Sequence, residues 1–147
     1  MKKLKWTFRW YGDNDPITLD HIRQIPNMHG VVGTLVKKLP GDLWTKEEIL
    51  ALKNAVEAKG LTLAGIESVS IHDSIKAGTP ERDHYIEVYK ENIKNLGELG
   101  VNVICYSFKP IFGWAKTNLE YELPDGSHTL EYDDKVVQQI EPKQMFG

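Results

Sequence analysis

The sequence has 147 residues, of which 41% are hydrophobic and 27% charged, and its formal net charge is −3. These values are typical of one soluble globular domain with a core of its own. The acidic balance excludes the basic surface that binds nucleic acid or anionic membranes, and no apolar run reaches the roughly 18 residues of a membrane span. The single cysteine, Cys105, excludes an internal disulfide. Because the N-terminal residues also lack an apolar signal segment, we expect a cytoplasmic protein.

Four segments have the composition of β-strands and begin about 30 residues apart, near the spacing of the units in a barrel of parallel strands. They are residues 5–11, 30–36, 61–68 and 101–108. The first alternates in character, so Arg9 and Tyr11 are expected on the face opposite Trp6, Phe8 and Trp10. The last is nearly all apolar, and we expect it to be buried on both faces.

Helix signals fill the intervals between these strands. Thr18 is expected to cap a short first helix. Thr45 and Glu48 form a T-x-x-E capping box at the start of the second helix. Thr79 is expected to cap a third helix that ends at Gly100.

After the fourth strand we expect a long loop to about residue 132, then a short helix capped by Asp133 or Asp134, with no fifth strand. Right-handed crossovers between sequential parallel strands place all helices on one face. The first strand-to-helix turn lacks the G-x-G-x-x-G pattern of a nucleotide-binding doubly wound sheet. The pattern therefore predicts an α/β fold of the (β/α)₈ TIM-barrel type. Residues 1–147 would supply its N-terminal four βα units, that is, half of the barrel domain, with no second domain.

Four motifs resemble the mannonate dehydratases: FRWYG at 8–12, IES-x-x-IH-x-x-IK at 66–76, CYSFKPIFGWAKT at 105–117 and LPDGS at 123–127. The resemblance implies a TIM barrel similar to that of xylose isomerase. It implies a carbon–oxygen lyase of carbohydrate metabolism that converts D-mannonate to 2-keto-3-deoxy-D-gluconate in hexuronate (glucuronate) catabolism. It also implies a divalent metal, Mn²⁺ (manganese) or Fe²⁺ (iron). Members of the family are more than twice as long, and their metal ligands lie in their second half. The catalytic and metal-binding residues are therefore expected outside this sequence.

Three candidate substrate-binding residues lie where the first and third strands end, the position at which TIM barrels carry their chemistry. Arg9 is suited to hold a sugar-acid carboxylate through two parallel hydrogen bonds, or to form a structural ion pair. Tyr11 follows it on the same face. Glu67, which we place on the face of Leu63 and Gly65, is suited to bind sugar hydroxyls or orient a metal ligand, and pairing with Arg9 is compatible with both.

Three further candidates lie in or beside loops. His72 follows the third strand and either touches the substrate or lies in solvent. Ser107 shares a face with Cys105, so this part of the fourth strand is expected to reach the pocket, whereas Cys105 itself is expected to be a small hydrophobic core residue. Trp114 either forms an apolar wall for a sugar or covers the core.

Two alternatives to a complete mannonate dehydratase stay open. The chain is a catalytically incomplete fragment or half-barrel subunit that needs a homo-oligomer or a complementary half-barrel, or it is a sugar-isomerase-like relative. In each case we expect a sugar-acid or sugar substrate and neither nucleic acid nor membrane as a partner. Because its histidines are scattered, we expect the 147-residue chain alone to bind no metal and not to dehydrate mannonate.

Overall fold

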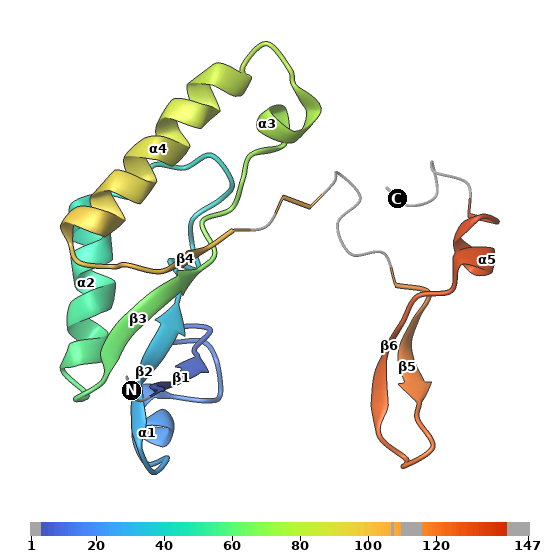
Figure 1. Cartoon of the computed structure of the whole chain (residues 1–147), viewed down its shortest axis with the longest axis horizontal. Coiled ribbons are helices and arrows are strands. Elements are labelled where there is room, and N and C mark those ends of the chain that lie inside the picture. The colour runs from blue at the N-terminus through green and yellow to red at the C-terminus, as the bar shows by residue number, and fades with distance from the viewer. Residues whose placement is uncertain (1–3, 107, 110–115, 141–147) are drawn as a thin grey trace. The chain divides into compact units, whose positions relative to one another are not determined.

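The structure, a computed structural model, describes residues 4–106, 108, 109 and 116–140. The chain divides into two compact units, Met1–Phe108 and Lys109–Gly147 (Figure 1). Each unit is described by itself.

The first unit contains a four-stranded parallel sheet in the order β1-β2-β3-β4. Its strands are β1 (Trp6–Arg9), β2 (Met28–Gly33), β3 (Thr62–Glu67) and β4 (Ile104–Cys105). The predicted strand order and direction are confirmed, and the fold is an α/β fold with a parallel sheet.

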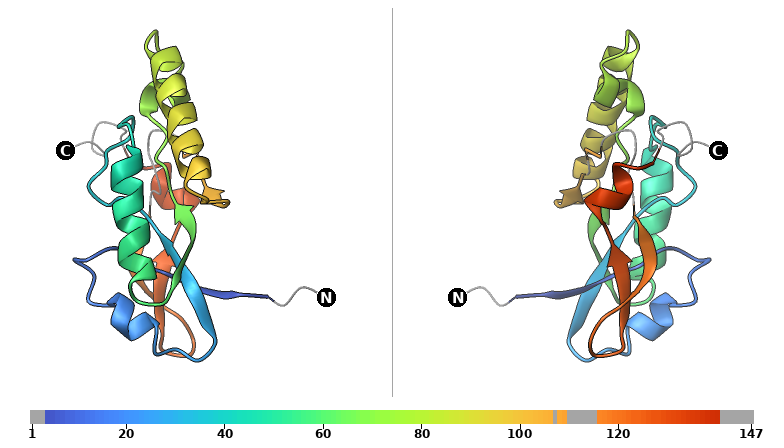
Figure 2. Two further views of the ribbon diagram at one scale, coloured as in Figure 1. Left: turned by 90° about the vertical axis from the view of Figure 1, so that its left-hand side faces the viewer. Right: turned by 90° about the vertical axis from the view of Figure 1, so that its right-hand side faces the viewer.

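Four helices belong to this unit: α1 (Leu19–Ile22), α2 (Lys46–Glu57), α3 (Asp73–Ala77) and α4 (Arg82–Glu98). The long helices α2 and α4 lie side by side on one face of the sheet (Figure 2). Ile22, Ile49 and Leu96 from α1, α2 and α4 are completely buried in one cluster with Val31 and Ile66 of the strands. This shared core confirms that the helices cover the same face.

In the first unit, the helix caps follow the sequence signals in two of three cases. The Thr18 and Thr45 side chains accept hydrogen bonds from the backbone N–H groups three residues later, as predicted. Thr79 does not cap α4. Its hydroxyl donates instead to Glu81 at 2.7 Å, and α4 begins without a side-chain cap. The segment before α4 also forms the short helix α3, although the sequence signals predicted one helix, not two, between the third and fourth strands.

The aromatic stripe of β1 is only partly covered by the helical layer. Trp10 is buried and Phe8 is half-buried against the core, but Trp6 is 70% exposed. The β1–β2 register shifts between Trp6 and Thr7, at the very start of an edge strand. Trp6 therefore does not share the buried environment of Phe8 and Trp10, with which the alternation grouped it, because the regular pairing begins one residue later.

A bulge in β3 changes which of its residues face the helices. Val31 and Val32 are adjacent in β2, but they pair with Leu63 and Gly65, so β3 contains one extra residue at this point. The bulge reverses the alternation beyond it. Ile66 joins Leu63 in the core, and Glu67 lies on the opposite face. Glu67 therefore lies on the face of the sheet away from the helices, which we call the inner face, and its predicted grouping with Leu63 is wrong.

The fourth strand is shorter and more exposed than predicted. In register with β3 it contributes Ile104 and Cys105, and the Ile66 N–H also donates to the Val103 carbonyl oxygen at 2.9 Å. Ile104 packs against the core, whereas Val103 and Cys105 are exposed. A strand at the edge of a sheet with helices on one face buries only that face, so the expectation of a strand covered on both faces, with Cys105 in the core, is wrong.

The second unit is an antiparallel hairpin of β5 (Asn118–Glu122) and β6 (His128–Glu131), followed by α5 (Asp134–Val137). Gly126 adopts a positive φ of 81° in the turn between the strands. The Asp133 side chain caps α5 by accepting from the Lys135 N–H, as predicted. The expectation of an unbroken loop to residue 132 is wrong.

Candidate functional site

Arg9 lies at the end of β1 and reaches two neighbouring strands. Its Nη1 donates to the carbonyl oxygens of Trp10 and Val32 at 2.5 and 3.3 Å, and its Nη2 donates to the carbonyl oxygen of Glu67 at 2.5 Å. The Tyr11 ring stacks against the guanidinium, with Cζ 4.5 Å from the ring centroid. The structure therefore brings Arg9, Tyr11 and Glu67 together at the C-terminal ends of the strands.

Glu67 forms an ion pair with Arg9, with 3.5 Å between Oε2 and Nε. The Glu67 side chain is 55% exposed, so its carboxylate remains accessible to other donors. The pairing of Arg9 with Glu67, which the sequence left open as one alternative, is present in the structure.

A pocket of about 330 Å³ lies beside this ion pair. Its lining includes Arg9, Thr34, Lys38, Trp44, Glu67 and Ser70. A volume of this size is within the range of small-molecule sites. Cationic, anionic and hydroxyl groups in one pocket suit a ligand that carries both a carboxylate and hydroxyl groups.

Lys38 and Thr34 belong to this pocket and were not predicted from the sequence. Lys38 Nζ is 2.8 Å from Glu48 Oε2 and donates to the Leu43 carbonyl oxygen at 2.7 Å. The hydrogen bonds from Lys38 and from the Thr45 backbone N–H hold the pKa of the Glu48 carboxyl below its ordinary value. The capping box of α2 is thus tied to the pocket wall. A lysine in a loop that follows a strand was the only available sequence signal, and it is too common to single out.

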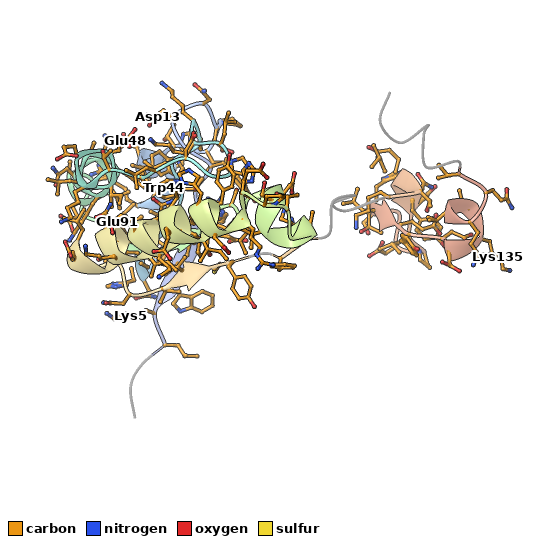
Figure 3. The ribbon with its side chains drawn as sticks, turned by 90° about the horizontal axis from the view of Figure 1, so that it is seen from above. Lys5, Asp13, Trp44, Glu48, Glu91 and Lys135 are labelled. Carbon is orange, nitrogen blue, oxygen red and sulfur yellow. The ribbon has the colours of Figure 1, made fainter. Side chains whose placement is uncertain are left out.

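Trp44 forms another wall of the pocket and lies within the first unit beside α4 (Figure 3). Its backbone N–H donates to Asn92 Oδ1 at 2.7 Å, and its carbonyl oxygen accepts from Asn95 Nδ2 at 2.9 Å. Both asparagines are buried. The loop before α2 is therefore held by side chains from α4.

His72 lies apart from the Arg9–Glu67 pair, in an adjoining cleft that shares Ser70 with the pocket. Its Nδ1 accepts a hydrogen bond from the Ser74 N–H at the start of α3. Its ring stacks on Tyr85, with the centroids 3.5 Å apart and the planes inclined by 13°. His72 thus has a structural role in the described contacts, and a role toward substrate stays a prediction.

The remaining candidates, Ser107 and Trp114, lie outside the described residues. Among the residues that are described, no group of three or more His, Cys, Asp or Glu side chains is arranged to hold a metal ion. In the same part of the chain, no helix combines the length and apolar character needed to cross a membrane.

Comparison with known proteins identifies the family. The family model described as D-mannonate dehydratase (UxuA) matches residues 4–146. The chain belongs to the D-mannonate dehydratase family. A mannonate dehydratase of Enterococcus faecalis is 60% identical over 144 residues, which cover 97% of this chain and 40% of the relative. One from Oceanobacillus iheyensis is 50% identical over 139 residues, covering 95% of this chain and 40% of that relative.

A solved structure of the same family agrees with the fold. The crystal structure of mannonate dehydratase from Streptococcus suis serotype 2 aligns with a TM-score of 0.88 at 42% identity, over 98% of this chain and 42% of that one. The chain thus spans about 40% of the length of the mannonate dehydratases that it matches.

Proposed function

We propose that this chain supplies part of the substrate pocket of a mannonate dehydratase, a lyase that removes water from D-mannonate to give 2-keto-3-deoxy-D-gluconate in hexuronate catabolism. The observation that carries the proposal is the family match over residues 4–146, which includes every described residue of the pocket. We further propose that residues 1–147 form four units of a xylose-isomerase-like (β/α)₈ barrel within one domain, and that the protein acts in the cytoplasm.

The chemistry of the pocket supports a sugar-acid ligand. D-mannonate presents one carboxylate and several hydroxyl groups. The cations Arg9 and Lys38 favour an anion in the pocket. Glu67, Thr34 and Ser70 offer oxygen acceptors, and the Ser70 hydroxyl can also donate. The Thr34 hydroxyl donates to the Ser68 carbonyl oxygen at 3.3 Å. We propose Tyr11, His72, Ser107 and Trp114 as further substrate contacts.

The described residues do not fit the Mn²⁺ or Fe²⁺ that the family implies. A catalytic metal site needs about three protein ligands with an open position, and the described residues contain no such group. We therefore propose that these residues bind and orient the substrate. The metal ligands would come from elsewhere in the assembled enzyme, on the same polypeptide, a second copy or a complementary half-barrel.

A chimeric enzyme tests this proposal. All 147 residues would replace the matching segment of the Enterococcus faecalis enzyme, and the keto-acid product would be measured with Mn²⁺ or Fe²⁺ present. We expect turnover of D-mannonate. Glu67→Ala should reduce kcat/KM about 10- to 100-fold, the loss expected for one charge-assisted hydrogen bond. A folded chimera without turnover would contradict the proposal, whereas full activity of Glu67→Ala in an active chimera would remove only Glu67 from the proposed substrate contacts.

A further inference from the structure

The hydrogen bonds of Arg9 limit what its guanidinium can offer a ligand. A guanidinium has five N–H donors. Three of them serve the carbonyl oxygens of Trp10, Val32 and Glu67, at the ends of three neighbouring strands. Its Nε lies 3.5 Å from the Glu67 carboxylate oxygen Oε2, with which it forms an ion pair. Arg9 therefore links β1, β2 and β3 at the edge of the sheet where the pocket lies.

Recognition of a carboxylate by arginine normally uses two parallel N–H groups. Both hydrogens of Nη1 are taken by carbonyl oxygens, and one face of the guanidinium is covered by Tyr11. A two-point grip on a substrate carboxylate would thus require Arg9 to give up a main-chain hydrogen bond or its contact with Glu67.

Glu67 is differently placed. No hydrogen bond within the described part of the chain ends on its carboxylate oxygens, which are held near Arg9 Nε and remain accessible in the pocket beside Thr34 and Ser70. An ionised carboxylate accepts hydrogen bonds only, and the hydroxyl groups of a sugar acid are donors. We infer that Glu67 contacts the substrate by accepting hydrogen bonds from its hydroxyl groups, and that Arg9 is a positioning residue that holds Glu67 and the strand ends. This assignment rests on the proposed function.

The chimera can distinguish hydroxyl binding by Glu67 from positioning by Arg9. D-mannonate is the substrate, and D-mannitol, which has the hydroxyl groups but no carboxylate, is used as a competitive inhibitor. Glu67→Gln should raise the KM for D-mannonate and the inhibition constant of D-mannitol alike, about tenfold or more, without changing the unfolding midpoint. Arg9→Lys should lower the unfolding midpoint and leave the ratio of the two constants unchanged.

Opposite results overturn the inference. If Arg9→Lys weakens D-mannonate but not D-mannitol and leaves the unfolding midpoint unchanged, Arg9 is the carboxylate ligand. If Glu67→Gln has no effect in an active chimera, Glu67 does not bind hydroxyls and only this inference fails. A folded wild-type chimera that is inactive contradicts the proposed function itself.

Matched controls come from exposed ion pairs on α4. Glu87→Gln and Arg82→Lys make the same chemical changes away from the pocket and should alter none of these constants. NMR spectroscopy of the guanidinium N–H groups in the 147-residue chain gives a second measurement. If Arg9 is held by three carbonyl groups, its Nη hydrogens should give separate resonances, and averaged resonances would contradict the positioning role.

Discussion

Replacement of Asn92 by alanine should destabilise the first unit by more than the loss of one hydrogen bond, because this one side chain makes two. Asn92 is 2% exposed. It accepts from the Trp44 N–H at 2.7 Å and donates to the Asp42 carbonyl oxygen at 2.9 Å. One asparagine on α4 therefore pairs two main-chain groups of the loop that precedes α2.

The magnitude follows from where these two groups lie. The Trp44 N–H is deeply buried, and losing its partner costs about 1–3 kcal/mol. Asp42 is exposed, so water can replace much of the second bond, with a loss of about 0.5–1.5 kcal/mol. Alanine is the better helix former by roughly 0.5 kcal/mol. The free energy of unfolding should fall by about 1–4 kcal/mol.

Asn54→Ala is the matched control because Asn54 is an exposed asparagine within α2. It gains the same helix propensity without losing a buried partner, so it should be neutral or slightly stabilising. Urea unfolding of the 147-residue chain, followed by tryptophan fluorescence and circular dichroism, measures both variants. If the two variants differ by less than about 0.5 kcal/mol, the loop is not held by Asn92 as described.

Three further outcomes are expected. Gly30→Ala should prevent regular β2–β3 pairing, because its Cβ would lie 2.1 Å from the Thr62 carbonyl oxygen. Gly97→Ala, in the last turn of α4 where an added Cβ meets no atom within 4 Å, should stabilise by up to about 1 kcal/mol, and thermal unfolding distinguishes the two variants. The lowered pKa of Glu48, which its bond to Lys38 causes, stabilises the fold above the unfolded glutamate pKa of about 4.3, and this stabilisation is lost as the pH falls through the lower folded value. Glu48→Gln should therefore flatten the loss of stability over that acidic range. The isolated chain should self-associate in light scattering through its exposed edge strands β1 and β4, and should not dehydrate mannonate; an active monomer would contradict both expectations.

Local sequence signals were sufficient for the arrangement of the sheet and the main helices. Thr18 and Thr45 were correctly read as caps because an N-cap depends on residues three or four positions apart. Predictions failed where a residue or segment could satisfy its hydrogen bonds locally in more than one way. Thr79 satisfies its hydroxyl with Glu81 instead of capping α4, and the polar segment 118–131 pairs as a hairpin although its strands have little apolar face.

The bulge in β3 shows why alternation alone could not place Glu67 for the right reason. Counting by twos from Leu63 puts Glu67 beneath the helices, yet the extra residue between the paired positions turns it to the inner face. The bulge is defined by pairing with β2, about 30 residues earlier, and no feature within 61–68 marks it. The alternation predicted that Leu63, Gly65 and Glu67 share one face, but Leu63 lies in the core and Glu67 lies on the inner face.

The pocket is shaped by side chains that reach from one βα unit to the main chain of another. Arg9 bonds to the carbonyl oxygen of Glu67, 58 residues away, and Thr34 bonds to that of Ser68, 34 residues away. Asn92 holds Asp42 across 50 residues. Such contacts depend on the assembled sheet, so motifs could indicate which strand ends carry polar residues but not which of their atoms remain available. In this pocket the carboxylate of Glu67 remains available to a ligand, whereas the hydrogen-bond donors of Arg9 are used within the protein.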